Sequence, residues 1–271
     1  MKTRVYGASQ ASHSEGLLSE KAEEFKIQGY TVLEKLLDPK QINYGRSSLD
    51  KIYLQQETDF GKTKLISINE LDIARCPLAY DDFFLRSIVL NDVVMSFIKF
   101  HLGDYFLLHL QNGIINRPNV EHHQSSWHRD LPYQNYIVSK PIAIGVLFCL
   151  DVFSPETGGT FVLPFSHQLE NIPSKSYLEK FEVQVNATSG SAIVFNAMLF
   201  HRAGYNSSQH IRRGINNVFS IPIIKQQIDL PRLLNGLYSE DPFLRKILGY
   251  ENQSPSSVKE YRSNRINRIK N

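Results

Sequence analysis

The feature that most constrains this chain is a series of short strand-like segments between Tyr105 and Pro222, separated by turn-forming residues. The segments are rich in aromatic and β-branched residues, and no long helical pattern lies between them. A parallel sheet needs a helix between successive strands, so this pattern favours an antiparallel sandwich or a double-sheet barrel. The expected strands are Tyr105–Ile115, Ile142–Leu150, Thr160–Leu163, Phe181–Val185, Ala192–Phe195 and Ile215–Pro222.

Helical patterns flank the strand-rich region on both sides. Asp38 is the expected N-cap of one of these helices, with Pro39 in its first turn. We therefore predict a single domain over residues 1–271, mainly β with flanking helices, whose β core covers about residues 104–222. The expected flanking elements are helices over Leu18–Lys26, Asp38–Gln56, Asn91–His101 and Pro231–Leu248, and a short strand at Tyr30–Leu33.

Charge and composition exclude several classes of protein. The 271 residues carry a net charge of +3, but residues 258–271 hold five basic residues and one acidic residue. This basic C-terminal tail therefore holds +4 and leaves −1 for the rest of the chain, which argues against a nucleic-acid-binding face. No apolar run is long enough for a membrane span, and no secretory signal is visible. Two widely spaced cysteines fit a reducing compartment, so we expect a cytoplasmic protein.

A histidine and an aspartate lie two residues apart in the segment Trp127–Pro132. On an extended chain, His128 and Asp130 project from the same side. One imidazole nitrogen and one carboxylate oxygen suit a divalent first-row metal ion. Alone this pair is a weak signal, because the same spacing arises often by chance.

Two downstream residues strengthen the signal. His201 follows a predicted turn and strand, and Arg212 lies eleven residues beyond it, at the start of another strand. Two histidines and a carboxylate form the facial triad of non-haem Fe(II) oxygenases, which leaves three coordination positions open on one side. Two of these positions suit an α-keto acid and the third suits O2. The distal carboxylate of the keto acid then needs a fixed planar cation, which an arginine provides.

These residues resemble a known family, that of the phytanoyl-CoA dioxygenases, which are Fe(II)/2-oxoglutarate oxygenases and include ectoine hydroxylase. The resemblance covers about residues 20–222, and the two histidines, the aspartate and the arginine fall in the family's order and spacing. Gly29–Glu34, followed by Leu37–Pro39, resembles the family's opening strand and helix. Gly158–His167 resembles the stretch that the family carries between the aspartate and the second histidine.

The resemblance implies a double-stranded β-helix, or jelly roll, with iron between its two sheets. It implies that His128, Asp130 and His201 bind Fe(II) and that Arg212 binds the cosubstrate 2-oxoglutarate. Arg213 is the alternative to Arg212, because side chains alternate along a strand. Asn116 matches a polar position that helps to hold 2-oxoglutarate in some members.

Two positions depart from the family pattern. Members often have a serine two residues after the second histidine, in contact with the cosubstrate, whereas this chain has Ala203. One hydrogen bond to the keto acid is therefore missing or replaced. Phe165 stands where the family usually has a glycine, which changes that turn.

The implied activity is that of a dioxygenase that uses O2 to hydroxylate an unactivated C–H bond and releases succinate and CO2. Polar and aromatic residues around the metal-binding motif indicate a small polar metabolite or biosynthetic intermediate as substrate. Desaturation and cyclisation stay open, as does the oligomeric state. Two other classes also stay open: a non-catalytic jelly-roll binding protein and a 2-oxoglutarate-independent, cupin-like metal enzyme. The candidate substrate residues are Trp127, Arg129, Tyr133 and Arg202.

Overall fold

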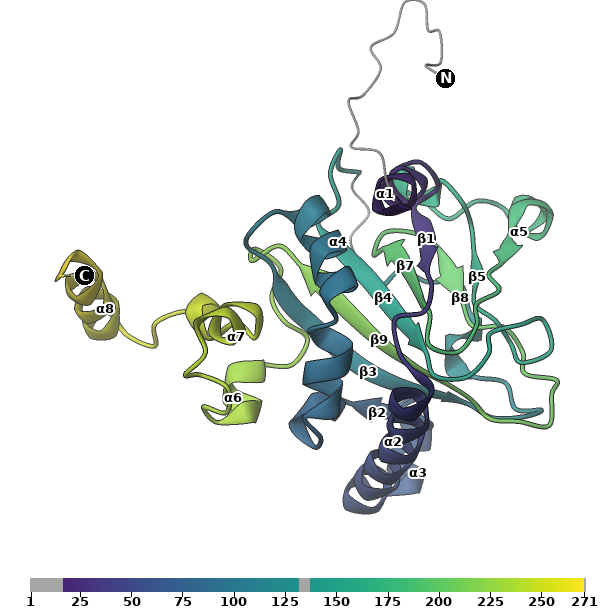
Figure 1. Cartoon of the computed structure of the whole chain (residues 1–271), viewed down its shortest axis with the longest axis horizontal. Helices are drawn as coiled ribbons and strands as arrows, with labels where there is room; N and C mark the ends of the chain where they lie inside the picture. The colour runs from purple at the N-terminus through teal and green to yellow at the C-terminus, as the bar shows by residue number, and fades with distance from the viewer. Residues whose placement is uncertain (1–16, 132–136, 271) are drawn as a thin grey trace, which may run out of the picture.

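The computed structural model describes residues 17–131 and 137–270, and its centre is a large antiparallel sheet (Figure 1). Six strands lie in the order β1-β7-β4-β9-β3-β2, and each neighbouring pair is antiparallel. The strand-rich pattern therefore formed an antiparallel sheet, as expected. The strands are β1 (Tyr30–Leu33), β2 (Ile73–Arg75), β3 (Leu107–Asn116), β4 (Ala143–Cys149), β7 (Ala192–Asn196) and β9 (Arg212–Ser220).

A smaller antiparallel sheet faces the large one. Its strands lie in the order β6-β5-β8 and are β5 (Phe161–Val162), β6 (Val183–Gln184) and β8 (His201–Arg202). An isolated antiparallel bridge joins His128 to His201 and so attaches the segment before residue 132 to the smaller sheet. Two facing sheets with flanking helices confirm the predicted fold class, a jelly-roll core that is mainly β.

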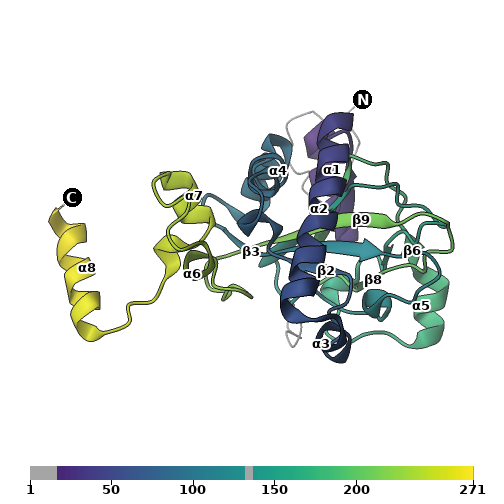
Figure 2. The same cartoon turned by 90° about the horizontal axis from the view of Figure 1, so that it is seen from below.

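Helices from the N-terminal third cover the outer face of the large sheet (Figure 2). The longest, α2, begins as predicted: the Asp38 carboxylate accepts hydrogen bonds from the backbone N–H groups of Lys40 and Gln41, and Pro39 occupies the first turn. Leu49 and Ile52 of α2 join Phe97 of α4 in one buried apolar cluster with sheet residues such as Phe148. The helices of this region are α1 (Leu17–Gln28), α2 (Pro39–Phe60), α3 (Lys62–Ser67) and α4 (Asp92–Leu102).

Alternation along the strands gives the large sheet two chemically different faces. In β4, Ile144, Val146 and Phe148 pack toward the helices, whereas Leu147 and Cys149 belong to a separate cluster on the inner face. A side chain on the inner face lies between the two sheets, because strand side chains alternate between faces. The inner face is therefore where a site enclosed by both sheets has to form.

Some elements differ from the sequence-based expectation. Phe181 ends a helix, α5 (Lys175–Phe181), so the strand expected over Phe181–Val185 is reduced to β6. Ser174 explains the difference, because its side chain accepts a hydrogen bond from the backbone N–H of Tyr177 and so caps a helix. Several short elements had no clear sequence pattern: the 3-10 helices Pro77–Ala79, His123–Ser125, Ser166–Gln168 and Tyr250–Asn252, and a π-helix at Phe84–Val89.

The C-terminal region is also broken more finely than expected. The helix expected over Pro231–Leu248 is two short helices, α6 (Leu230–Leu234) and α7 (Pro242–Ile247). Asn235 and Gly236 separate them, since both have positive φ angles, of 47° and 87°. The basic tail forms α8 (Val258–Lys270), which stands apart from the sheets in both views (Figures 1 and 2).

Helix α2 is the only described helix of 18 residues or more, and its residues are too polar to cross a lipid bilayer.

The close approach of α2 to the sheet yields a stability prediction. A Cβ atom added at Gly113 of β3 would lie 2.2 Å from Cδ1 of Leu49. Gly113→Ala should therefore lower the free energy of unfolding by about 1–3 kcal/mol in urea denaturation, because the core is overpacked. In a Leu49→Ala background the same change should cost less than half as much, since the clash is gone. Equal costs in the two backgrounds would contradict this packing.

Candidate metal centre

Three side chains with metal-binding atoms converge between the two sheets. One ligand atom each from His128, Asp130 and His201 lies within 4.8 Å of the other two. Backbone hydrogen bonds of 3.0 and 3.1 Å pair His128 with His201, so their side chains project from the same face. Asp130 follows on that face, because it lies two residues beyond His128 along an extended segment.

The two imidazoles are held so that one nitrogen of each faces the cluster. Nδ1 of His128 lies 2.8 Å from the carbonyl oxygen of Ser126, and Nδ1 of His201 lies 3.0 Å from that of Leu199. A carbonyl accepts only from a protonated nitrogen, so Nε2 is the nitrogen that carries the lone pair when each ring is neutral. This is the usual outer support of a histidine that binds a metal through Nε2.

The distances and charges of the cluster fit a divalent ion. Nε2 of His201 lies 3.4 Å from Oδ1 of Asp130, and two ligands each about 2.1 Å from an octahedral ion lie about 3 Å apart. Oδ2 of Asp130 accepts a hydrogen bond of 3.2 Å from the Asn216 amide, which fixes the carboxylate. The residues present therefore fit a two-histidine, one-carboxylate site.

The protonation states agree with this interpretation. Burial, together with neighbouring His201, lowers the pKa of His128 to about 4, so this ring is neutral at pH 7. Burial alone would raise the pKa of Asp130, but pairing with a protonated His201 outweighs it and lowers that pKa, and the same pairing raises the pKa of His201 against the effect of burial. Without an ion a proton on Nε2 of His201 thus takes the place that a metal cation would fill. Asp130 is therefore an anion inside the protein, where a cation is the natural partner.

Gly145 of β4 makes room for this carboxylate. A Cβ atom at Gly145 would lie 2.5 Å from the ring of Phe195 and 3.1 Å from Oδ2 of Asp130. Phe195 in turn packs against His201, with ring centroids 4.6 Å apart. The glycine therefore lets the aromatic ring and the carboxylate share the space over β4.

Arg212 lines the same cavity as the three ligands, and its side chain is almost fully buried, with 2% exposed. One terminal nitrogen donates a 2.9 Å hydrogen bond to the carbonyl of Gly158, and the guanidinium lies over the ring of Phe153. Its Nε–H is buried and has no partner among the described residues. Burial lowers the pKa of Arg212 to about 10, which still leaves it charged at pH 7.

The neighbouring arginine points to the opposite face. Arg213 makes two 2.8 Å hydrogen bonds to both carboxylate oxygens of Asp50 in α2, and a 3.2 Å ion pair with Asp151. Its donors are used to join the helical layer to the sheet. Of the two arginines that the sequence left open, Arg212 is the one that faces the ligands.

The other candidate residues have different surroundings. Asn116 pairs directly with Arg212 across the strands, but its amide donates to the carbonyl of Gly204, and it does not line the cavity. The guanidinium of Arg129 donates to the backbone carbonyls of Met198, Leu169 and Glu170 and does not line the cavity either. Its nitrogens hold three loop carbonyls, so we assign it a structural role in place of substrate binding.

Arg202 does line the cavity, but its charge is already paired. It makes an ion pair with Glu182 at 2.9 Å and lies between the rings of Phe161 and Trp127, at 3.9 and 5.3 Å from their centroids. Trp127 therefore contributes through this stacking. Tyr133 lies outside the described residues, so its role in substrate binding stays a prediction.

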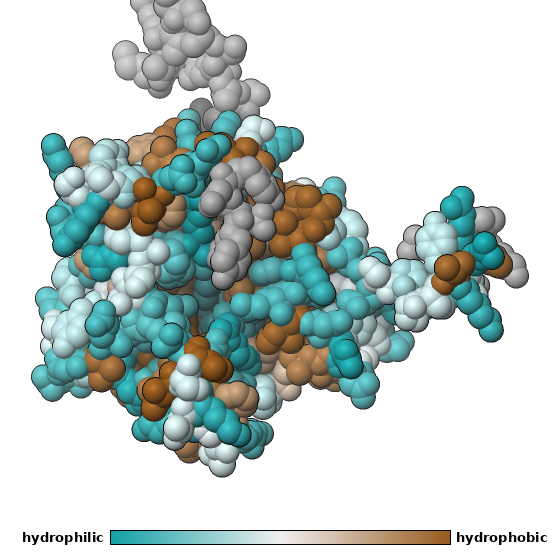
Figure 3. All heavy atoms as spheres, turned by 180° about the vertical axis from the view of Figure 1, so that it is seen from behind, coloured by the Kyte–Doolittle hydropathy of each residue, from teal (hydrophilic) through white to brown (hydrophobic). Residues whose placement is uncertain are grey.

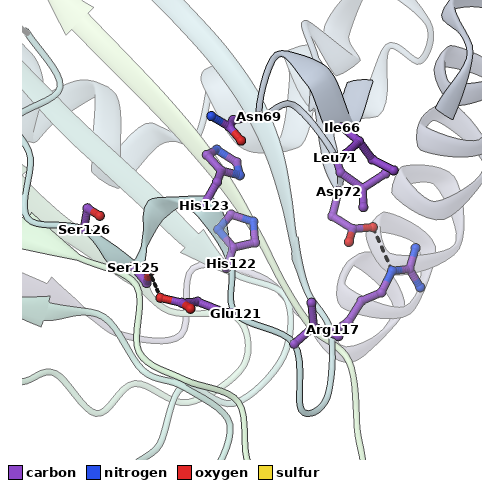
Figure 4. A pocket seen from close by; sticks show the side chains of 11 residues that line it. Ile66, Asn69, Leu71, Asp72, Arg117, Glu121, His122, His123, Ser125 and Ser126 are labelled. Atoms are coloured by element: carbon purple, nitrogen blue, oxygen red, sulfur yellow. Dashed lines mark hydrogen bonds and ion pairs between the residues drawn. The ribbon is translucent and has the colours of Figure 1, made fainter. Parts of the chain in front are cut away.

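A second, larger cavity of about 410 Å³ adjoins the segment that carries the ligands (Figure 4). Its polar groups include an ion pair between Arg117 and Asp72 at 2.7 Å and a hydrogen bond from Ser125 to Glu121 at 3.0 Å. Seen from the side opposite to α2 and α4, the surface is hollowed and mostly hydrophilic (Figure 3). Sequence reasoning had named only His122 and His123 of these residues as pocket candidates. The lining residues are Ile66, Asn69, Leu71, Asp72, Arg117, Val120, Glu121, His122, His123, Ser125 and Ser126.

Within this cavity, His122 is a buried residue that the sequence offered, with His123, as a pocket candidate. The side chain is 7% exposed and stacks on His123 with ring centroids 4.5 Å apart. Burial and the charges of His123, Arg212 and His128 lower its pKa to about 3, so the ring is neutral. Adjacent histidines on a regular strand would point in opposite directions, whereas these two stack because His122 caps a 3-10 turn.

Comparison with known proteins places the chain in a family. The phytanoyl-CoA dioxygenase family matches residues 25–214, and the chain belongs to this family. Uncharacterized protein Rv1501 of Mycobacterium tuberculosis is 34% identical over 247 residues, which cover 86% of this chain and 87% of the relative. Dioxygenase andF of Emericella variicolor is 29% identical over 160 residues, 55% of this chain and 53% of that protein.

Solved structures share the fold. Ectoine hydroxylase EctD from S. alaskensis, crystallised with 2-oxoglutarate and 5-hydroxyectoine, superimposes with a TM-score of 0.64 at 17% identity. The match covers 79% of this chain and 80% of that one. The epimerase SnoN, in a complex with Fe3+, alpha ketoglutarate and nogalamycin RO, gives a TM-score of 0.57 at 15% identity. That match covers 76% of this chain and 84% of SnoN.

The cluster makes a direct prediction about metal binding. His128→Ala removes one of three ligands, so the dissociation constant for Mn(II) or Co(II), measured by calorimetry, should rise at least about 100-fold. His210→Ala is the matched control, because that histidine is exposed and lies outside the cluster. Unchanged metal affinity in folded His128→Ala protein would rule out this residue as a ligand.

Proposed function

We propose that the chain is an Fe(II)- and 2-oxoglutarate-dependent dioxygenase that hydroxylates a C–H bond of a small polar molecule. The observation that carries this proposal is the placing of three ligands and one buried arginine around a single cavity. A purely binding jelly roll has no need for open metal positions. A metal enzyme that uses no keto acid has no need for a buried cation beside them.

His128, Asp130 and His201 would hold the iron. Their fixed rings and carboxylate approach from one side, which leaves the opposite side for exchangeable ligands. Asn216 and the carbonyls of Ser126 and Leu199 keep the three side chains in place before the ion arrives. A preorganised site of this kind loses less free energy to ordering when it binds its metal.

Arg212 would hold the distal carboxylate of 2-oxoglutarate. It is charged, buried and already oriented by the Gly158 carbonyl and the Phe153 ring, and its Nε–H is unused. A charge-assisted hydrogen bond is strong in such a water-poor surrounding. The keto acid would thus be fixed at one end by the iron and at the other by the arginine.

Fe(II), when bound with 2-oxoglutarate and O2, supplies the oxidising chemistry, and the keto acid leaves as succinate and CO2. The chain's own part is to position the reactants and to exclude water. Apolar walls from Ile114, Leu147 and Phe195 line the cavity beside the ligands. These residues keep bulk solvent from the reacting groups, which limits unproductive turnover.

The cavity of about 410 Å³ supports a small polar substrate. Its lining offers an ion pair, a further carboxylate, hydroxyl groups and two stacked imidazoles, with few large apolar side chains (Figure 4). A fatty chain would take water away from these polar groups without offering them hydrogen bonds, at a cost in binding free energy. The substrate class is tested by measuring succinate release with each of a panel of polar metabolites. A polar substrate should raise this rate above the rate without substrate.

The two adjacent arginines give a matched test of the proposed function. Arg212→Ala should raise the dissociation constant for 2-oxoglutarate roughly a hundredfold in anaerobic Fe(II)-loaded protein, because it removes charge-assisted hydrogen bonds. Arg212→Lys should have a dissociation constant between those of the parent protein and Arg212→Ala, since lysine keeps the charge without the planar fork.

Arg213→Ala is the control for this experiment. It should lower the midpoint of thermal unfolding, because it breaks the ion pairs to Asp50 and Asp151, and leave 2-oxoglutarate affinity within about twofold. The reverse pattern, with affinity lost only in Arg213→Ala, would show that the assignment of the two arginines is wrong.

A further inference from the structure

We infer that His122 donates a second hydrogen bond to the carboxylate of 2-oxoglutarate that Arg212 holds. In this chain it would replace the serine hydroxyl that Ala203 lacks. The inference rests on the proposed function and assigns a cosubstrate contact that lies outside the three ligands and Arg212. It follows from the tautomer of His122, from its place on a segment that pairs with residues 203–206, and from two buried donors without partners among the described residues.

The tautomer is set by the backbone. The N–H of Gln124 donates to Nδ1 of His122 at 3.2 Å, so Nδ1 carries a lone pair. In a neutral imidazole the proton must then be on Nε2, which becomes a hydrogen-bond donor. Nε2 is buried and has no partner among the described residues.

The chain path places this donor next to the arginine. Residues 119–124 run alongside residues 203–206: Asn119 N–H donates to the Asn206 carbonyl, and Ala203 N–H donates to the Gln124 carbonyl, both at 2.8 Å. Gln124 and Ala203 line the cavity together with Arg212. His122 lies two residues before Gln124 on this paired segment and lines the adjoining larger cavity. The charge of Arg212 is among the causes that lower the pKa of His122, which agrees with this placing.

Two buried donors in this place have no acceptor among the described residues. They are Nε of Arg212 and Nε2 of His122, and both side chains are more than nine-tenths buried. Buried polar groups are paired in most native proteins, so two buried donors that both lack an acceptor point to a ligand that accepts hydrogen bonds. A carboxylate has two oxygens that accept, and it can take one hydrogen bond from each donor.

Ala203 explains why this contact is needed here. Its side chain offers no donor, and its backbone N–H is already bound to Gln124. The keto acid would therefore keep only the arginine at its distal end. His122 would supply a donor from the segment that pairs with residues 203–206, where its ring stacks on that of His123 (Figure 4).

The test measures 2-oxoglutarate binding directly, by anaerobic titration of the Fe(II)-loaded protein and by calorimetry on the Mn(II)-loaded protein. His122→Phe keeps an aromatic ring and removes the donor, so it should raise the dissociation constant about tenfold or more. His122→Asn keeps a donor and should stay within about threefold of the parent protein. Ala203→Ser added to His122→Phe should recover most of the affinity, because it restores a hydroxyl on the facing wall.

His210→Phe is the matched control, because it makes the same substitution at an exposed histidine that lines neither cavity. It should leave 2-oxoglutarate affinity unchanged. Metal affinity and thermal unfolding of every variant show whether the site is still folded. If His122→Phe does not fold, the pair His122→Ala and His122→Ala/Ala203→Ser answers the same question.

The outcomes separate the two proposals. Failure of the parent protein to bind 2-oxoglutarate in the presence of metal would overturn the proposed function itself. Normal binding by the parent and equal binding by His122→Phe would overturn only the role of His122. Loss of substrate affinity in His122→Phe, with 2-oxoglutarate binding unchanged, would also overturn it and place His122 on the substrate side.

Discussion

The antiparallel bridge between His128 and His201 is the contact on which the site depends. It pairs two segments far apart in the sequence by reciprocal backbone hydrogen bonds, and it orients both imidazoles toward Asp130. A slip of one residue in this pairing would turn one ligand away from the others, because side chains alternate along extended chains. The backbone carbonyls of Ser126 and Leu199 then select the nitrogen that each ring presents.

Because of the same alternation, one face of the large sheet packs against the helices and the other faces the ligands. Arg213 binds Asp50 of α2 and holds the helical layer, whereas Arg212, one residue earlier, faces the ligands. In β4, Phe148 packs under the helices and Gly145 leaves space for Asp130. Packing on the face that meets the helices therefore fixes the strands that carry the charged groups on the other face. This explains how a charged, water-poor site keeps a fixed shape.

Local pattern was enough to predict the strand-rich core and the flanking helices, whereas His128, Asp130 and His201 were brought together as ligands by the resemblance to a known family. The core and the helices depend on periodicity and short spacing, which can be seen in one sequence. Contacts between distant segments could not be seen in this way. The carbonyls that occupy Arg129, the carboxylate that pairs with Arg202 and the turn that buries His122 all depend on how loops meet in the fold.

The most direct test of this account is the visible spectrum of the metal-free protein as Fe(II) and 2-oxoglutarate are added without oxygen. Chelation of the iron by the keto acid gives a weak charge-transfer band, and the account predicts that this band needs both components. It should be absent with Fe(II) alone and with 2-oxoglutarate alone. Folded protein that binds Fe(II) but shows no band when 2-oxoglutarate is added would contradict the account.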